Sequence, residues 1–128
     1  MKVLLINKYS ASDGDLFPWS FKANKIGKVI GTRTWGGIIG ISGPLPYMDG
    51  TDVRVPFFTN YDAKTGQWIV ENHGVDPDIL IDNDPVKEQL GEDQQLNKAI
   101  EVILQELKDR KPLPPVPAPR TYKDLGVE

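Results

Sequence analysis

The chain begins with an apolar run that stops abruptly at small and acidic residues. Residues 3–6 read Val-Leu-Leu-Ile and predict a short buried strand, and helix-start chemistry follows at Ser12, Asp13 and Asp15. Nucleophilic serines are often presented at such a strand-to-helix junction, because the unpaired N–H groups of the first helical turn can stabilise an oxyanion there. Ser12 is therefore the candidate nucleophile.

A purely structural role fits the same residues. Ser12 is a good N-cap, and Asp15, three residues later, fits as its partner in a capping box. Capping serines far outnumber nucleophilic ones, so the local pattern alone favours the cap. Evidence from elsewhere in the chain is needed to choose between the two roles.

The amino-acid composition excludes several classes of function for this chain. The 128 residues fit one domain with a modest core, and their 39% hydrophobic and 26% charged content is typical of a soluble globular protein. The 15 basic and 18 acidic residues are spread along the chain, so no nucleic-acid partner is expected. The chain has no cysteine and one histidine, which excludes thiolate catalysis, disulfides and Cys- or His-rich metal sites within it.

No apolar run approaches the roughly 20 residues that cross a bilayer, so we expect no membrane association. The sequence predicts a soluble protein. It leaves the compartment undetermined, with the cytoplasm as one candidate.

The remaining pattern alternates helices with short strands, which predicts an α/β domain. We expect a helix over 13–25 with Pro18 in its first turn, a helical turn over 84–91, and an amphipathic helix that follows the N-cap Asp93 and carries Leu96 to Leu107. Strands are expected over 28–31, 52–58, 67–71 and 75–81. Between the first two strands we expect a glycine-interrupted β-rich run over 32–43 and a loop over 44–50.

The chain changes character at its proline-rich end. Residues 111–119 cannot continue a helix and predict an extended polyproline II segment. We therefore expect a domain over residues 1–110 and a Pro-rich tail over 111–128. A core built only from the predicted elements leaves the first strand and the last helix short of partners, which predicts that the chain is part of a larger unit.

Five segments follow one another in a specific order. They are Asn7-Lys-Tyr-Ser-Ala-Ser-Asp-Gly-Asp15, Val29-Ile-Gly-Thr-Arg-Thr-Trp-Gly-Gly37, Glu71-Asn-His-Gly-Val-Asp-Pro-Asp78, Asp82-Asn-Asp-Pro85 and Asp93-Gln-Gln-Leu-Asn-Lys-Ala-Ile100. Together they closely resemble the C-terminal half of the tricorn-type serine peptidase core, a relative of the carboxyl-terminal processing peptidases. The resemblance covers residues 3 to about 108. It implies a partial crotonase/ClpP-like α/β domain with a mixed β-sheet and a C-terminal amphipathic helix.

The resemblance also implies roles for individual residues. Ser12 matches the nucleophile, and the N–H of Asp13 matches one oxyanion donor. Glu71 matches the carboxylate that orients the charge relay, although a strand-end carboxylate in a turn is an equally good structural reading of it. The glycine-rich run, with Gly36, Gly37 and Ile38, would let a peptide substrate bind as an added strand.

The chain differs from the carboxyl-terminal processing peptidases mainly in the residue that would act as the general base. Carboxyl-terminal processing enzymes place a lysine base where this chain has Gly37, whereas tricorn-type enzymes use a histidine, and a second oxyanion N–H, from sequence upstream of this half. His73 lies two residues from Glu71, but a local hydrogen bond is its favoured role. The resemblance implies short peptide substrates, no metal or organic cofactor, the remaining half of the peptidase domain as a partner, and a homo-oligomer.

Two other functions fit the sequence. The chain could be a non-catalytic fragment or interaction module that self-associates through exposed sheet edges. It could also be a crotonase-like acyl-binding protein, which would hold a thioester with two backbone N–H groups and need no serine nucleophile.

Overall fold

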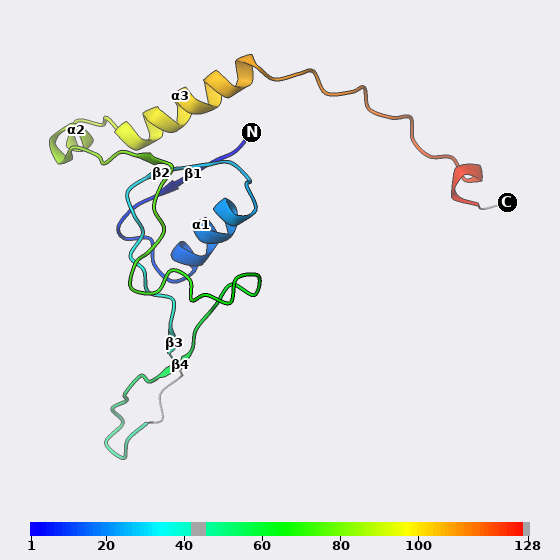
Figure 1. Ribbon diagram of the computed structural model, residues 1–128. Helices are drawn as coiled ribbons and strands as arrows, with labels where there is room; N and C mark the ends of the chain where they lie inside the picture. Colours follow the sequence, from blue (N-terminus) through cyan, green and yellow to red (C-terminus); the bar gives the residue numbers. More distant parts are fainter. Residues whose placement is uncertain (42–45, 127–128) are drawn as a thin grey trace.

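A computed structural model gives the structure of the chain and describes residues 1–41 and 46–126. The centre of the fold is a three-stranded parallel sheet in the order β1–β2–β5 (Figure 1). Its strands are β1 (Val3–Ile6), β2 (Lys28–Gly31) and β5 (Ile79–Leu80). Val3 pairs with Lys28 and Ile30 with Ile79, so β2 is the central strand.

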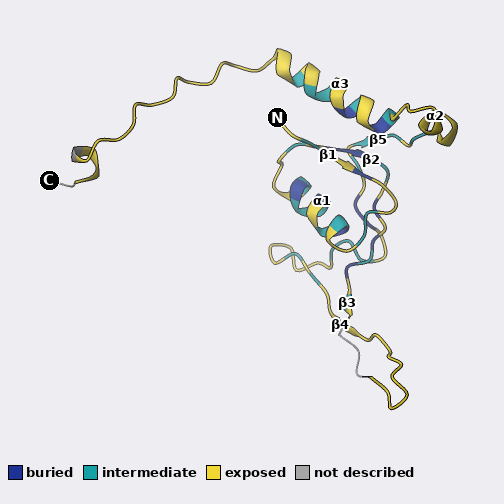
Figure 2. Ribbon diagram, turned by 180° about the vertical axis from the view of Figure 1, so that it is seen from behind, coloured by how far each residue is buried: buried dark blue, intermediate teal, exposed yellow. Residues whose placement is uncertain are grey.

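Two helices cover opposite faces of this sheet. Helix α1 (Asp13–Ala23) lies on one side, and helix α3 (Gln94–Lys108) lies on the other, as Figures 1 and 2 both show. Phe21 of α1 packs with Ile6 and Val29 in the buried core. Covering both faces is usual for parallel sheets, whose strands are apolar on both sides.

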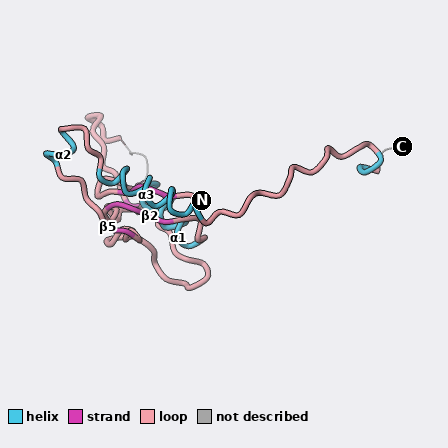
Figure 3. The backbone as a smooth tube through the Cα atoms, turned by 90° about the horizontal axis from the view of Figure 1, so that it is seen from above, coloured by secondary structure: helices cyan, strands magenta, loops and turns pink. Residues whose placement is uncertain are grey.

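The other elements lie outside this core. Helix α2 (Pro85–Gln89) precedes α3, and a two-stranded antiparallel sheet of β3 (Gly40–Ile41) and β4 (Pro56–Phe58) extends away from the parallel sheet (Figure 1). Beyond α3 the chain runs away from the helices as an exposed segment without helix or strand, and ends in a short 3-10 helix, η1 (Lys123–Leu125) (Figures 2 and 3). The division at residue 110 stays a prediction.

The α/β class predicted from the sequence is confirmed. The parallel and antiparallel strands of the described residues form two separate sheets, however, and not one mixed sheet. Helix α1 ends at Ala23 and not at residue 25, because Lys25 has the left-handed φ of 51°. Pro18 is the sixth residue of α1, so its expected place in the first turn was wrong. Pro18 lies inside the helix and is buried.

Several predicted strands are shorter or absent. The strand expected over 67–71 was wrong, because this segment ends in a turn in which Val70 has a φ of 65°, and Trp68 forms only an isolated bridge with Tyr61. The strand expected over 52–58 reduces to β4. The strand expected over 75–81 reduces to β5, since Pro77 lacks an N–H and the carboxylate of Asp78 takes the N–H of Val29 in place of a ladder bond.

The glycine-interrupted run predicted to be β-rich over residues 32–43 contains little strand in its described part. Residues 33–39 form a loop, and among the described residues that follow Gly31 in this run, β3 is the strand. The last two residues of this run, 42 and 43, and the first two of the loop expected over 44–50, lie outside the described residues.

Candidate active site

Ser12 lies where the loop after β1 enters helix α1. Its side chain is exposed, and its backbone has φ 57° and ψ −112°, a region that non-glycine residues rarely occupy. Such a conformation costs on the order of 1–3 kcal/mol and persists only when its surroundings determine it. The turn therefore presents Ser12 at the surface in an unusual and fixed orientation.

The N–H of Asp13 follows directly. Asp13 is the first residue of α1, so its N–H has no partner within the helix, and no group of residues 1–41 or 46–126 accepts a hydrogen bond from it. Asp13 is exposed. An unpaired N–H in the residue that follows an exposed serine is what the oxyanion role requires.

The carboxylate of Asp15 is fully buried and accepts three backbone hydrogen bonds. Its Oδ1 accepts from Gly36 N–H at 2.9 Å, and its Oδ2 accepts from Gly37 N–H at 3.1 Å and from Ser12 N–H at 3.0 Å. The capping-box partnership with Ser12 was predicted from the sequence, whereas the bonds to the two glycines were not. No local signal marks them, because the two glycines lie 21 and 22 residues further along the chain.

Glu71 holds the next part of the same loop. Its Oε2 accepts from Ile38 N–H at 2.7 Å and from Ile39 N–H at 3.0 Å. The peptide group between Gly37 and Ile38 also accepts the N–H of Ser12 through the Gly37 oxygen, at 3.2 Å. Ser12 and Glu71 therefore bind the two ends of one peptide group.

The structure brings Gly36, Gly37 and Ile38 next to Ser12 and Glu71. The N–H groups of Gly36 and Gly37 are already bonded to the Asp15 carboxylate, and that of Ile38 to the Glu71 carboxylate. The carbonyl of Gly36 accepts from Asn72 N–H at 2.8 Å. A peptide added as a strand would therefore have to use other groups of the loop. The substrate-binding role of these residues stays a prediction.

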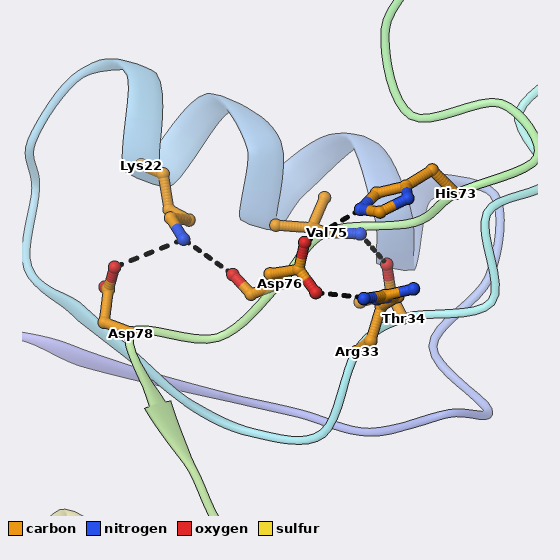
Figure 4. A network of polar contacts seen from close by, with 7 residues as sticks. All are labelled: Lys22, Arg33, Thr34, His73, Val75, Asp76 and Asp78. Carbon is orange, nitrogen blue, oxygen red and sulfur yellow. Dashed lines mark hydrogen bonds and ion pairs between the residues drawn. The ribbon is translucent and has the colours of Figure 1, made fainter.

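His73 takes part in a local polar network. Among the described residues, no hydrogen bond or ion pair joins His73 to Ser12. Its Nε2 lies 2.8 Å from Oδ2 of Asp76, and Nε of Arg33 donates to Oδ1 at 2.6 Å (Figure 4). The ammonium of Lys22 reaches the carbonyl of Asp76 at 2.6 Å from helix α1. This arrangement agrees with the local role expected for the histidine.

Asp76 makes the stability of the fold dependent on pH. The hydrogen bond from His73, followed by that from Arg33, lowers the pKa of Asp76 below its ordinary value of 3.8. A carboxyl whose pKa is lower in the folded state stabilises the fold above its unfolded pKa, and this contribution is lost as pH falls through the folded pKa.

We therefore expect D76N to flatten the acid side of the stability curve. The wild-type free energy of unfolding should fall below about pH 4, and the variant should show less of that fall. At pH 7 the loss should be below about 1 kcal/mol, because the pairs are exposed. Urea titrations at several pH values measure both effects. Identical acid slopes for the two proteins would contradict the prediction.

An exposed serine on a left-handed strand-to-helix turn, with a free N–H beside it, is typical of the serine hydrolase class. The sequence pattern of peptidase family S41 matches residues 2–81, and the chain belongs to this family. The resemblance to tricorn-type peptidases is confirmed by relatives that match most of the chain.

The tricorn protease of Thermoplasma volcanium is 43% identical over 109 residues, which are 85% of this chain and 10% of that protein. A putative tricorn-like protease C-terminal subunit of Sulfurisphaera tokodaii is 44% identical over 108 residues, 84% of this chain and 12% of that one. A crystal structure of the tricorn protease matches with a TM-score of 0.76 and 42% identity, over 83% of this chain and 10% of that chain. The chain thus spans about a tenth of the length of these relatives. None of the helices in the described part is long and apolar enough to span a membrane.

Proposed function

We propose that this chain is the nucleophile-bearing half of a tricorn-like serine peptidase domain, with a partial crotonase/ClpP-like fold. The observation that carries the proposal is the exposed Ser12 on its left-handed turn, next to the unpaired N–H of Asp13. The family membership of the chain supports a peptide as the substrate.

In this mechanism a histidine from the remaining half of the domain takes the proton of the Ser12 hydroxyl. The oxygen attacks the carbonyl carbon of a short peptide, and the Asp13 N–H donates to the resulting oxyanion. When the peptide C–N bond breaks, the base returns the proton to the leaving amine, and a water molecule then hydrolyses the acyl-enzyme in the same way. The reaction needs no metal or organic cofactor.

The contacts of Glu71 are compatible with its proposed role in the relay. Only Oε2 is bonded to Ile38 and Ile39, and within the described residues Oε1 has no hydrogen-bond partner. One oxygen therefore fixes the side chain to the loop, while the other can accept a hydrogen bond from the group that orients the base. Glu71 would then act as an anchored acceptor.

Covalent labelling tests the proposal. A chimera in which this chain replaces the matching 109-residue segment of the Thermoplasma volcanium relative supplies the remaining half of the domain. We expect a fluorophosphonate probe to label Ser12 in the chimera, and to label the isolated chain slower by several orders of magnitude, since the chain alone lacks the proposed base. Absence of labelling in the chimera, with the parent relative labelled, would refute the proposal.

A non-catalytic interaction module is the second candidate. Leu96, Ile100, Leu104 and Leu107 repeat along α3 and are 42–55% exposed, so the helix carries an exposed apolar stripe. In the peptidase this stripe would contact the remaining half of the domain or another subunit of a homo-oligomer. A chimera that assembles but leaves Ser12 unlabelled would favour the module.

A further inference from the structure

We propose that Asp15 is a positioning residue for the nucleophile. Its buried carboxylate ties the Ser12 backbone to the Gly36-Gly37 loop and so holds the hydroxyl and the Asp13 N–H in their relative orientation. This inference rests on the proposed nucleophilic role of Ser12. Asp15 itself does not contact the substrate in this proposal, because its side chain is fully buried.

The strained conformation of Ser12 needs a restraint, and Asp15 provides it from two directions. The carboxylate accepts the N–H of Ser12 at 3.0 Å, while the backbone N–H of Asp15 donates to the carbonyl of Ser12 at 2.9 Å. Both ends of the Ser12 residue are therefore bonded to Asp15. Hydrogen bonds to an ionised carboxylate are roughly twice as strong as neutral ones, which suits a restraint on a strained turn.

The same carboxylate fixes the turn relative to the rest of the site. Gly36 and Gly37, 21 and 22 residues further along the chain, donate to its two oxygens. Gly37 then accepts the Ser12 N–H through its carbonyl, and the following N–H binds Glu71. Asp15 thus connects Ser12 to the loop that Glu71 holds from the other side.

This arrangement differs from an ordinary helix cap. At the start of α3, the exposed Asp93 accepts from Leu96 N–H in its own helix and from the side chain of the nearby Asn83. The carboxylate of Asp15 accepts no hydrogen bond from its own helix. All three of its donors lie outside α1, in the N-cap residue and in the distant loop. Asp93 is therefore a matched control for a carboxylate that only caps.

Replacing Asp15 by asparagine tests the positioning role. Asparagine keeps the size of the side chain but turns one of the two acceptor oxygens into an NH₂ donor, which would face a backbone N–H. In the chimera we expect the maximal rate of fluorophosphonate labelling of D15N to fall about 100-fold, because small misplacements of a reacting group can cost that much. The probe concentration giving half-maximal rate, and the midpoint of the pH profile, should stay unchanged because the base is intact.

The control and the conservative variant separate positioning from stability. D93N should lower the melting temperature yet label Ser12 as fast as the wild type. D15E, which keeps the charge, should label faster than D15N and about 10-fold slower than the wild type, and it carries the test if D15N does not fold. Labelling of D15N or D15E within twofold of the wild type would overturn the positioning role alone. A wild-type chimera that is not labelled would instead refute the proposed function.

Discussion

Replacing Ser12 by alanine should reduce peptide turnover by the chimera roughly 10⁶-fold in kcat, which is the size of the effect when the nucleophile of a serine peptidase is removed. The substituted side chain is exposed, and its methyl group fits where the serine Cβ already lies, so the fold should be retained. Hydrolysis of a fluorogenic peptide, together with a circular dichroism spectrum, measures both properties.

Ser10 is the matched control for this substitution. It lies two residues earlier in the same loop, and its hydroxyl accepts the N–H of Asn7 at 3.1 Å. S10A should lose that bond and about 1 kcal/mol of stability, while turnover stays within a few-fold of the wild type. If S10A abolished turnover and S12A did not, Ser10 would be the nucleophile. If S12A left acyl binding intact and the wild type showed no turnover, a thioester-binding protein would be favoured.

Replacing Gly36 by alanine should cost about 3–5 kcal/mol of stability, which is a large effect for one methyl group. Gly36 has φ +86°, and a Cβ there would lie 2.5 Å from the backbone nitrogen of Gly74 and 2.9 Å from the backbone of His73. Backbone atoms cannot rotate away, so the turn of residues 70–74 would have to move from the loop. The bonds from Gly36 to Asp15 and Asn72 should break with it.

An alanine at Gly91 separates the two causes of this destabilisation, which are the positive φ and the steric clash of the added Cβ. The φ of Gly91, +87°, is nearly the same, but a Cβ there would meet nothing within 4 Å. G91A should therefore cost only the left-handed backbone penalty, about 1–2 kcal/mol. Chemical denaturation of both variants gives the difference, which measures the close approach of the two backbones. Equal losses would show that this approach contributes nothing to stability.

The sequence was most predictive where the pattern is local. The apolar runs at residues 3–6 and 28–31 became adjacent strands, and Asp93 does cap α3. The strand predicted over residues 67–71 was wrong, because no residue type in this segment indicated the left-handed φ of Val70 and Asn72. The turn of residues 70–74 brings Gly74 against the backbone of Thr34, 40 residues earlier in the chain, and such a tertiary contact leaves no local signal in the sequence.

The sequence named the residues of the candidate site, whose roles stay predictions, but not the hydrogen bonds that connect them. Ser12, Asp13 and Glu71 were identified from helix-start chemistry and from family resemblance. The hydrogen bonds of Asp15 to Gly36 and Gly37 cross 21 and 22 residues, so no local rule could find them. For the same reason, the sequence did not show that N–H groups predicted to bind a peptide would be occupied by carboxylates.

The peptide group between Gly37 and Ile38 has a mechanical consequence. A peptide group is planar and stiff, so its two ends cannot move independently. One end accepts from the turn of Ser12, and the other donates to Glu71. A tilt of this single plane, for example when a ligand pulls on the neighbouring β3, would disturb both contacts at the same moment. In the proposed mechanism, attack by Ser12 and the relay through Glu71 would then be gained or lost together.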